Sequence, residues 1–343
     1  MSRIGQNPLK WIKSDDEPRK ITIVTAVHIP ELSGFWKDAL LVLEKSINSL
    51  YENTSKPFDF MVLDNGSCKD VRSYLYDCFN CNKIQFLTFS RYNMRKIGAM
   101  NYLFSVAPGE IISFTDSDVY FKKGWLDATL DIMNTYPKAG MVSAIPTIDK
   151  SIDYYNNTLK DVKESKEIII TSGNSLIPDN YIEAHRLSLG KTVENYMMNI
   201  KDRIDTKITK NGINAYVCAQ DFQFTTRKDI IAKVLPLVVT DQNIYFDPIY
   251  SPVFESKLDK LGFWRLSTEQ YLIHHMGNSL KNLQKELALI RNRVEEKTNL
   301  LIENKPKPKT KTIPLSSRVI KHPLIRKMLK NCYSIIYKLL YES

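Results

Sequence analysis

Apolar runs and helix-forming segments alternate along the first 145 residues of this 343-residue chain. The apolar runs are continuous and rich in β-branched residues, which is typical of strands that are buried on both faces. Between them, apolar residues recur at helical spacing. We expect strands at residues 21–27, 58–63, 84–89, 111–115 and 141–145, and helices at residues 38–50, 69–79, 95–107 and 125–136.

Strand–helix alternation with short connections predicts an α/β fold with a mostly parallel central sheet. In sheets of this kind, ligands bind beyond the carboxyl ends of the strands. The residues that directly follow each strand are therefore the first candidates for a functional site.

The chain is less regular after this first half. Residues 146–212 are polar, and we expect a variable insertion with a helix near residues 193–204. Apolar order returns at residues 214–225. A helix should follow, opened by a capping box that runs from Thr226 to Asp229.

The C-terminal part contains further helical patterns and a linker. We expect a helix at residues 253–261 that ends at Gly262, because glycine readily adopts the left-handed conformation of a helix C-terminus. Leu and Ile residues recur at helical spacing over residues 280–294, and we interpret them as a helix packed on its own domain, with a short coiled coil as the alternative. Lys alternates with Pro or Thr over residues 305–311, which predicts an extended linker.

The last segment has the pattern of a basic amphipathic helix. At 100° per residue, the apolar residues from Leu324 to Leu340 fall in an arc of about 160°, with Lys and Arg residues opposite. Such a helix is typical of a segment that lies on an anionic membrane surface. We expect that role, with docking on the catalytic domain or on a partner subunit as the alternative.

The net charge of +10 comes mostly from residues 301–343, which include this helix. Residues 301–343 contain ten Lys or Arg and two Glu, so the preceding residues have 48−10=38 basic and 38−2=36 acidic side chains. A nearly neutral body without a basic, aromatic stripe argues against a nucleic-acid-binding module, and we expect no nucleic-acid partner. The hydrophobic fraction of 43% is ordinary for a globular protein.

The sequence also carries signals for location. Its five cysteines are odd in number and irregularly spaced, which favours a reducing compartment. The N-terminal residues have no signal-peptide core, and no apolar run approaches the roughly 20 residues of a membrane span. We therefore expect a cytoplasmic protein that is peripheral on the inner face of the cytoplasmic membrane.

Two acidic motifs follow predicted strands. Asp64 begins an Asp-Asn-Gly-Ser segment, which by itself could be only a turn. Asp116 and Asp118 are two residues apart, so in an extended chain their side chains lie on the same face. Both carboxylates can therefore point to one spot beyond the strand. Converging carboxylates suit a hard divalent cation, Mn²⁺ or Mg²⁺, although a solvated turn would have the same sequence.

Three further residues stand at the ends of predicted elements. Lys96 opens the helix before the Asp116 strand, Asp221 ends another apolar stretch, and His275 follows a third. Taken alone, each of these residues could be an ordinary packed or surface side chain without a functional role.

Taken together and in order, these segments resemble GT-A-fold glycosyltransferases of the family 2 type. The resemblance covers about residues 20–278 and depends on the succession of motifs rather than on any one of them. They are Thr25-Ala26-Val27, Pro30-Glu31, Asp64-Asn65-Gly66-Ser67, Lys96-Ile97-Gly98-Ala99-Met100-Asn101, Phe114-Thr115-Asp116-Ser117-Asp118, Gly124-Trp125-Leu126, Gln220-Asp221, Gly262-Phe263 and His275-Met276-Gly277.

The resemblance implies roles for five residues that would bind a nucleotide sugar. Thr25, Glu31 and Asp64 would bind the base and its ribose. Lys96 would help to position the donor, and Asp116 would contact the ribose or metal-bound water.

The resemblance also implies a metal site and a catalytic base. Asp118 would be a direct metal ligand, with His275 as a further ligand or a diphosphate contact. Asp221 matches the base position of inverting members. The Glu that usually precedes this Asp is Gln220 here, so the sequence has one carboxylate fewer than the family pattern.

The resulting prediction is a metal-dependent, inverting glycosyltransferase with Mn²⁺ or Mg²⁺ as cofactor. Its donor would be a nucleotide sugar, with a UDP-sugar favoured, and its acceptor a glycan, a glycolipid or a polysaccharide, with a lipid-linked acceptor included. Self-association into a homo-oligomer stays open. A nucleotidyltransferase or sugar pyrophosphorylase is the alternative enzyme class, although residues 28–34 lack the Gly-rich, basic loop typical of that class.

The predicted organisation then has six segments. They are an N-terminal segment (1–19), a nucleotide-sugar-binding half (20–145), an acceptor-binding half (146–278), a helix (279–304), a basic linker (305–312) and a membrane-associating tail (313–343).

Overall fold

The structure of the chain is a computed structural model. Its described residues are 17–147, 157–201, 203–238, 253–281 and 283–284. Clustering of contacts divides the chain into residues 1–289 and 290–343, so every described residue belongs to the first unit. The predicted linker and tail, and most of the predicted helix at residues 279–304, lie outside the described residues.

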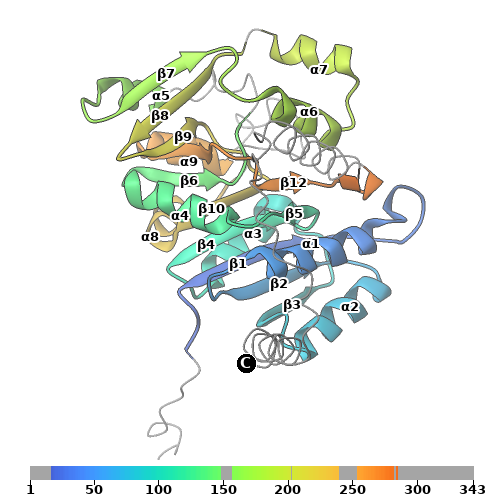
Figure 1. Ribbon diagram of the computed structural model, residues 1–343. Helices are drawn as coiled ribbons and strands as arrows, with labels where there is room; N and C mark the ends of the chain where they lie inside the picture. Colours follow the sequence, from blue (N-terminus) through green and yellow to red (C-terminus); the bar gives the residue numbers. More distant parts are fainter. Residues whose placement is uncertain (1–16, 148–156, 202, 239–252, 282, 285–343) are drawn as a thin grey trace, which may run out of the picture. The chain divides into compact units, whose positions relative to one another are not determined.

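A ten-stranded sheet forms the centre of this unit, in the order β3-β2-β1-β4-β10-β6-β11-β9-β8-β7 (Figure 1). The pairing registers show that seven strands run in one direction, while β7, β9 and β10 run in the opposite direction. The α/β fold with a mostly parallel sheet is therefore confirmed. The strands are β1 (Ile21–Val27), β2 (Asp59–Asn65), β3 (Phe86–Ser90), β4 (Ile111–Asp116), β6 (Ala139–Ser143), β7 (Ile169–Gly173), β8 (Asp205–Lys210), β9 (Ile213–Val217), β10 (Gln223–Arg227) and β11 (Trp264–Thr268).

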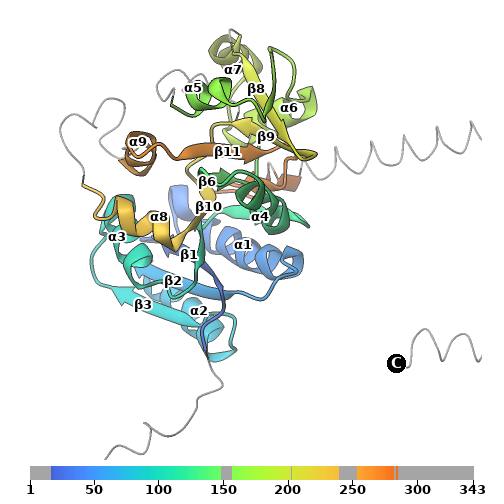
Figure 2. The same ribbon diagram turned by 90° about the vertical axis from the view of Figure 1, so that its left-hand side faces the viewer.

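Helices cover both faces of the sheet (Figure 2). One apolar cluster joins α1, α2 and the start of α4 to β1 and β2, and a second joins α3, α8 and α9 to β1, β4 and β10. Residues Ile23 and Val27 of β1 belong to the first cluster and Val24 to the second, which explains why the strand reads as a continuous apolar run. The helices are α1 (Ala39–Asn53), α2 (Lys69–Asn80), α3 (Arg95–Val106), α4 (Trp125–Thr135), α5 (Asn157–Glu164), α6 (Asp179–Ser188), α7 (Val193–Ile200), α8 (Lys228–Val234) and α9 (Val253–Lys260), with a short 3-10 helix at Gly34–Trp36.

The predicted elements of the first half agree with the structure to within three residues at each end. Residues 146–212 contain α7, which agrees with the helix expected near residues 193–204, but they are more regular than the expected variable insertion, because they also contribute α5, β7, α6 and β8. β8 pairs with β7 on one side and with β9 on the other, so this segment extends the sheet. The polar composition concealed these strands because β7 lies at the sheet edge and exposes part of its surface.

The predicted capping box at Thr226 is wrong. Thr226 belongs to β10 and its hydroxyl donates to the carbonyl of Gly140 at 2.6 Å. The N-cap of α8 is Arg227, and no side chain caps this helix. The Thr226 hydroxyl, which the local sequence predicts as a helix cap, therefore forms its hydrogen bond from a buried position within a strand.

A second, two-stranded sheet pairs β5 (Val119–Phe121) with β12 (Ile273–His275). Each strand has three residues, which is too short for a period of two to be recognised in the sequence. Separately, none of the helices in the described part of the chain has both the length and the apolar character needed to cross a membrane.

Stacked phenylalanine rings provide a test of the core. Phe224 is 1% exposed and its ring lies 5.5 Å from that of Phe114 and 5.0 Å from that of Phe254. We expect Phe224→Ala to lower the free energy of unfolding by about 3–5 kcal/mol in urea titrations. Phe35→Ala is the control, because Phe35 is 72% exposed. Equal losses in the two variants would contradict this packing.

Candidate active site

Three parallel strands bring candidate side chains to one edge of the sheet. β1 lies between β2 and β4, with Asp64 of β2 opposite Val27 and Asp116 of β4 opposite Ala26. Thr25 is the next residue back along β1. The carboxyl ends of these strands therefore bring Thr25, Asp64 and Asp116 to the same edge, as the position rule for α/β sheets predicts.

The predicted base reaches this edge from a strand that runs the other way. β10 is antiparallel to β4, with Gln223 opposite Thr115. The carbonyl of Phe222 accepts a hydrogen bond of 2.7 Å from the backbone N of Asp116. Asp221 directly precedes Phe222, so it lies beside the end of β4.

Lys96, in the first turn of α3, connects the two sides of the site. Its Nζ lies 2.7 Å from Oδ2 of Asp221 and 3.4 Å from Oδ2 of Asp116. Burial lowers the pKa of Lys96, but both carboxylates raise it, and they prevail, so Lys96 is charged at neutral pH. Burial raises the pKa of Asp116 to about 6, although Lys96 acts in the opposite direction.

Strand β12 brings His275 to Asp118. His275 is opposite Val119 of β5, and the backbone N of Met276 donates to the carbonyl of Asp118 at 2.8 Å. Nε2 of His275 consequently lies 3.2 Å from Oδ2 of Asp118. Burial lowers the pKa of His275, but the Asp118 carboxylate raises it to about 9, so the imidazole is protonated at neutral pH.

Asp118 and His275 offer donor atoms that suit a divalent cation. Oδ1 of Asp118 and Nδ1 of His275 are buried without a hydrogen-bond partner. Within the described residues, no three or more His, Cys, Asp or Glu side chains form a group that could hold a metal. Because Mg²⁺ is often bound by one or two carboxylates plus substrate phosphates, the pair fits a cation whose other ligands come from a bound diphosphate.

The predicted nucleotide-binding residues differ in how well they are placed. Thr25 is 2% exposed and its Oγ1 has no hydrogen-bond partner. Asp64 is fully buried, accepts a hydrogen bond from the N of Ser67 at 3.0 Å and lies 3.5 Å from Nε of Arg72. Glu31 is exposed and has no hydrogen bond or ion pair with any described residue, so its role stays a prediction.

The loop that carries Asp221 has an unusual backbone. Cys218 has a φ of +87°, and its N donates to the carbonyl of Arg265 at 2.8 Å. A non-glycine residue in this region is uncommon, and such strain often accompanies functional sites. Gln220, which replaces the expected Glu, donates its backbone N to Oγ of Ser143 at 3.1 Å.

The structure adds a buried acid that we did not predict from the sequence. Glu255 of α9 is 7% exposed, and burial together with the charge of Asp221 raises its pKa. The segment around it resembles any amphipathic helix. No sequence signal marked Glu255, because only the packing of α9 on the sheet brings it near Asp221.

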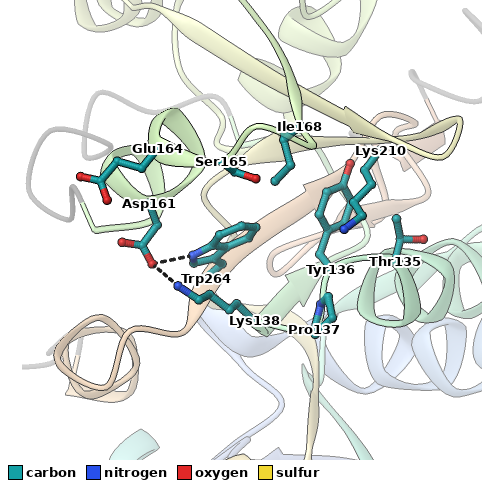
Figure 3. Close-up of a pocket in the computed structure, with 10 residues that line it drawn as sticks. All are labelled: Thr135, Tyr136, Pro137, Lys138, Asp161, Glu164, Ser165, Ile168, Lys210 and Trp264. Atoms are coloured by element: carbon teal, nitrogen blue, oxygen red, sulfur yellow. Dashed lines mark hydrogen bonds and ion pairs between the residues drawn. The ribbon is translucent and has the colours of Figure 1, made fainter.

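A pocket of about 380 Å³ lies elsewhere, between the end of α4, α5 and Trp264 (Figure 3). It is at the amino ends of β6 and β11, where Ala139 pairs with Trp264. These strands run in the same direction as β4, so the pocket is at the edge opposite to Asp116. Asp161 accepts from Lys138 at 2.9 Å and from the Trp264 indole at 3.1 Å, which makes this a mutually satisfied surface cluster.

Part of the chain matches a known family model. Residues 38–190 match the family model described as glycosyl transferase family 2. The matched segment contains Asp64, Lys96, Asp116 and Asp118. Over these residues the chain is similar to glycosyl transferase family 2, and the resemblance stated from the sequence is confirmed there.

Individual relatives are distant. An uncharacterized glycosyltransferase of Nostoc sp. (strain PCC 7120) is 24% identical over 137 residues, which cover 39% of this chain and 42% of that protein. GalNAc-T7, solved with UDP, GalNAc and Mn²⁺, aligns with 75% of this chain and 43% of its own at 11% identity and a TM-score of 0.45. TarS of S. aureus, solved with UDP-GlcNAc, aligns with 36% of this chain and 33% of its own at 18% identity and a TM-score of 0.30.

The ion pair between Asp118 and His275 can be tested without any ligand. Asp118→Asn removes the charge that raises the pKa of His275, while the burial that lowers it remains. We expect the pKa to fall from about 9 to a value at or below the ordinary 6.5, measured by NMR titration of the imidazole in metal-free protein. Asp127→Asn, which changes an exposed carboxylate paired with Lys56, is the control. An unchanged His275 pKa in Asp118→Asn would show that the pair does not form.

Proposed function

We propose that this protein transfers a glycosyl group from a nucleoside-diphosphate sugar to an acceptor hydroxyl, with the aid of a divalent cation and with inversion at the anomeric carbon. One observation carries the proposal. The Asp118–His275 pair and the Lys96–Asp221 pair meet at the carboxyl ends of β1, β2 and β4. This combination provides a binding site for a charged donor beside a carboxylate that can act as a base.

The donor would bind at the ends of β1 and β2. Thr25 Oγ1 is buried and unsatisfied, so a nucleotide that hydrogen-bonds to it would remove an existing cost. Asp64 is fixed by Ser67 and Arg72 at the adjacent position, where a carboxylate can accept from base N–H or ribose hydroxyl groups. These groups favour a UDP-sugar or a related donor.

Asp118 and His275 would hold Mn²⁺ or Mg²⁺. A cation held by these two side chains would supply positive charge to the diphosphate that leaves the sugar. Asp118 Oδ1 points to no other partner among the described residues, which supports its assignment as the direct ligand. His275 would have to lose its proton to act as a ligand, so its binding of a metal releases a proton.

Asp221 is the proposed catalytic base. Its Oδ2 accepts from Lys96 at 2.7 Å, and no described residue donates to Oδ1. Oδ1 is therefore available to take the proton of the acceptor hydroxyl. As that O–H bond breaks, the acceptor oxygen bonds to the anomeric carbon, and the carbon–phosphate oxygen bond breaks with its electron pair on the diphosphate. A single displacement of this kind inverts the configuration.

The acceptor and the location are inferred from the sequence. A glycan, glycolipid or lipid-linked polysaccharide acceptor is consistent with a basic, amphipathic tail that would concentrate a cytoplasmic enzyme on an anionic membrane. A screen of nucleotide sugars by thermal stabilisation, with and without Mn²⁺, would identify the donor.

The metal assignment predicts a specific loss in Asp118→Asn. In the wild type, UDP should bind weakly in a chelator and more tightly with Mn²⁺, as measured by calorimetry. Asp118→Asn should lose this Mn²⁺-dependent gain and most transfer activity while it keeps its melting temperature. Asp127→Asn is the matched control at an exposed position. Full wild-type activity in a chelator would refute the metal requirement.

The base assignment predicts a different loss in Asp221→Asn. A base acts on the acceptor and not on the nucleotide, so UDP affinity should be retained while transfer falls by about 10²–10⁴-fold. Binding and turnover are measured on the same preparation. Wild-type turnover in this variant, or a product that retains the donor's anomeric configuration, would overturn the inverting mechanism.

The tail assignment predicts that truncation releases the protein from membranes. Without residues 305–343, the protein should no longer sediment with anionic vesicles, while turnover on a soluble acceptor should be preserved. High salt should weaken vesicle binding of the full chain only in part, because salt screens the charges, worth roughly 1 kcal/mol each, but not the apolar burial. Continued sedimentation or aggregation of the truncated chain would show that the tail is part of the fold.

A further inference from the structure

The loop that connects β9 to β10, residues 218–222, carries the proposed base. Its last residue is tied to β4, because the N of Asp116 donates to the carbonyl of Phe222 at 2.7 Å. Its middle is tied to the end of β6, because the N of Gln220 donates to Oγ of Ser143 at 3.1 Å. The conformation of its first residue then sets the direction in which the loop leaves β9.

That first residue, Cys218, has a backbone conformation that favours glycine. Its φ is +87°, in the left-handed region that residues with a Cβ seldom adopt. Such a conformation persists only where the surrounding structure enforces it, and Cys218 is 5% exposed, so these surroundings are protein atoms. One contact comes from the backbone. The N of Cys218 donates to the carbonyl of Arg265 at 2.8 Å, next to the pairing of Val217 with Leu266.

The side chain of Arg265 holds Cys218 as well. Its Nη1 donates to Sγ of Cys218 at 3.4 Å, and the thiol in turn donates to the carbonyl of Ala219 at 3.8 Å. The guanidinium is itself fixed by Asp259 of α9, with Nη2 3.1 Å from Oδ2 and Nε 3.4 Å from Oδ1. Arg265 is 3% exposed and Asp259 6%. A two-point contact of this kind fixes the plane of the guanidinium, and therefore the place of the sulfur beside it.

We propose that Arg265 is a positioning residue for the base Asp221 and acts through Cys218. This inference rests on the proposed function. The guanidinium, oriented by Asp259, holds Cys218 in the left-handed conformation and so turns the loop toward the end of β4. Three residues after Cys218, the loop delivers Asp221 to Lys96, with 2.7 Å between Oδ2 and Nζ.

The consequence for the reaction follows from the backbone. Without its side-chain contact, Cys218 is free to relax toward the negative φ that residues with a Cβ prefer. The chain beyond it then changes direction, and Asp221 shifts relative to the acceptor hydroxyl. The proposed donor-binding groups on β1, β2 and β4 lie outside this loop and keep their positions. Loss of the contact should therefore lower kcat and leave donor affinity unchanged.

The test compares Cys218→Ala, which removes the acceptor atom, with Cys218→Ser, which retains one. Cys218→Ala should lower kcat by roughly tenfold, because a small misplacement of a catalytic group is costly. The Kd for UDP with Mn²⁺, measured by calorimetry on the same preparation, should be unchanged. Cys218→Ser should recover part of the lost kcat. Cys78→Ala is the matched control, because Cys78 is a buried cysteine of α2, 4% exposed, and its loss should lower the melting temperature but leave kcat unchanged.

Two further variants separate the side-chain contact from the backbone conformation. Cys218→Gly adopts a positive φ without strain but offers no acceptor to Arg265, so its kcat should fall as in Cys218→Ala. Arg265→Lys keeps the positive charge but lacks the planar fork, and it should show the same loss of kcat with unchanged Kd. If Arg265→Lys does not fold, the Cys218 variants decide. A wild-type kcat in Cys218→Ala or Cys218→Gly, or a loss of donor affinity as large as the loss of kcat, would overturn the proposal.

A separate measurement keeps this inference distinct from the proposed function. If the wild type transfers no sugar from any nucleotide sugar, the proposed function fails, and urea titrations still test the positioning. Lys96→Met, Asp221→Asn and the double variant give the coupling between the two side chains. This coupling should be smaller in a Cys218→Ala background, because the displaced loop no longer holds Asp221 at Lys96. An equal coupling in both backgrounds would show that Cys218 does not position Asp221.

Discussion

The antiparallel insertion of β10 between β4 and β6 is the constraint on which the site depends. In a parallel sheet, the residues that follow each strand meet at one edge. β10 runs the other way, so the residue that meets this edge is Asp221, which precedes the strand. The hydrogen bond from the N of Asp116 to the carbonyl of Phe222 joins the two strand ends. Strand direction thereby places Asp221, the proposed base, beside the proposed donor site.

Bringing several carboxylates to one place creates an electrostatic problem that the same elements solve. Asp116, Asp118 and Asp221 would repel one another, and Lys96 and His275 lie among them at hydrogen-bonding or ion-pair distances. Such pairs need not stabilise the fold, because desolvation offsets much of the attraction, but removing one partner leaves an uncompensated charge. The pairs therefore act mainly to maintain the geometry of the site before any ligand binds.

The family match and the geometry divide the site in a consistent way. The matched residues 38–190 include Asp64, Lys96, Asp116 and Asp118, but they end before Asp221 and His275. The later residues join the site through the β10–β4 pairing and the β12–β5 pairing. The part of the site that matches the family model is thus completed by residues from outside the matched segment.

The sequence by itself determined the parts that depend on local pattern. Continuous apolar runs predicted strands that are buried on both faces. The acidic motifs that follow them predicted that Asp64 and Asp116 lie at the same edge of the sheet. The pattern failed at Thr226, where a strand position looked like a helix cap, and in residues 146–212, where polar edge strands looked like an insertion. Only the tertiary structure placed Lys96 on Asp221 and His275 on Asp118. These contacts join residues that are far apart in the chain, and they follow from strand direction, pairing register and helix packing, none of which leaves a periodic signal in the sequence around the residues themselves.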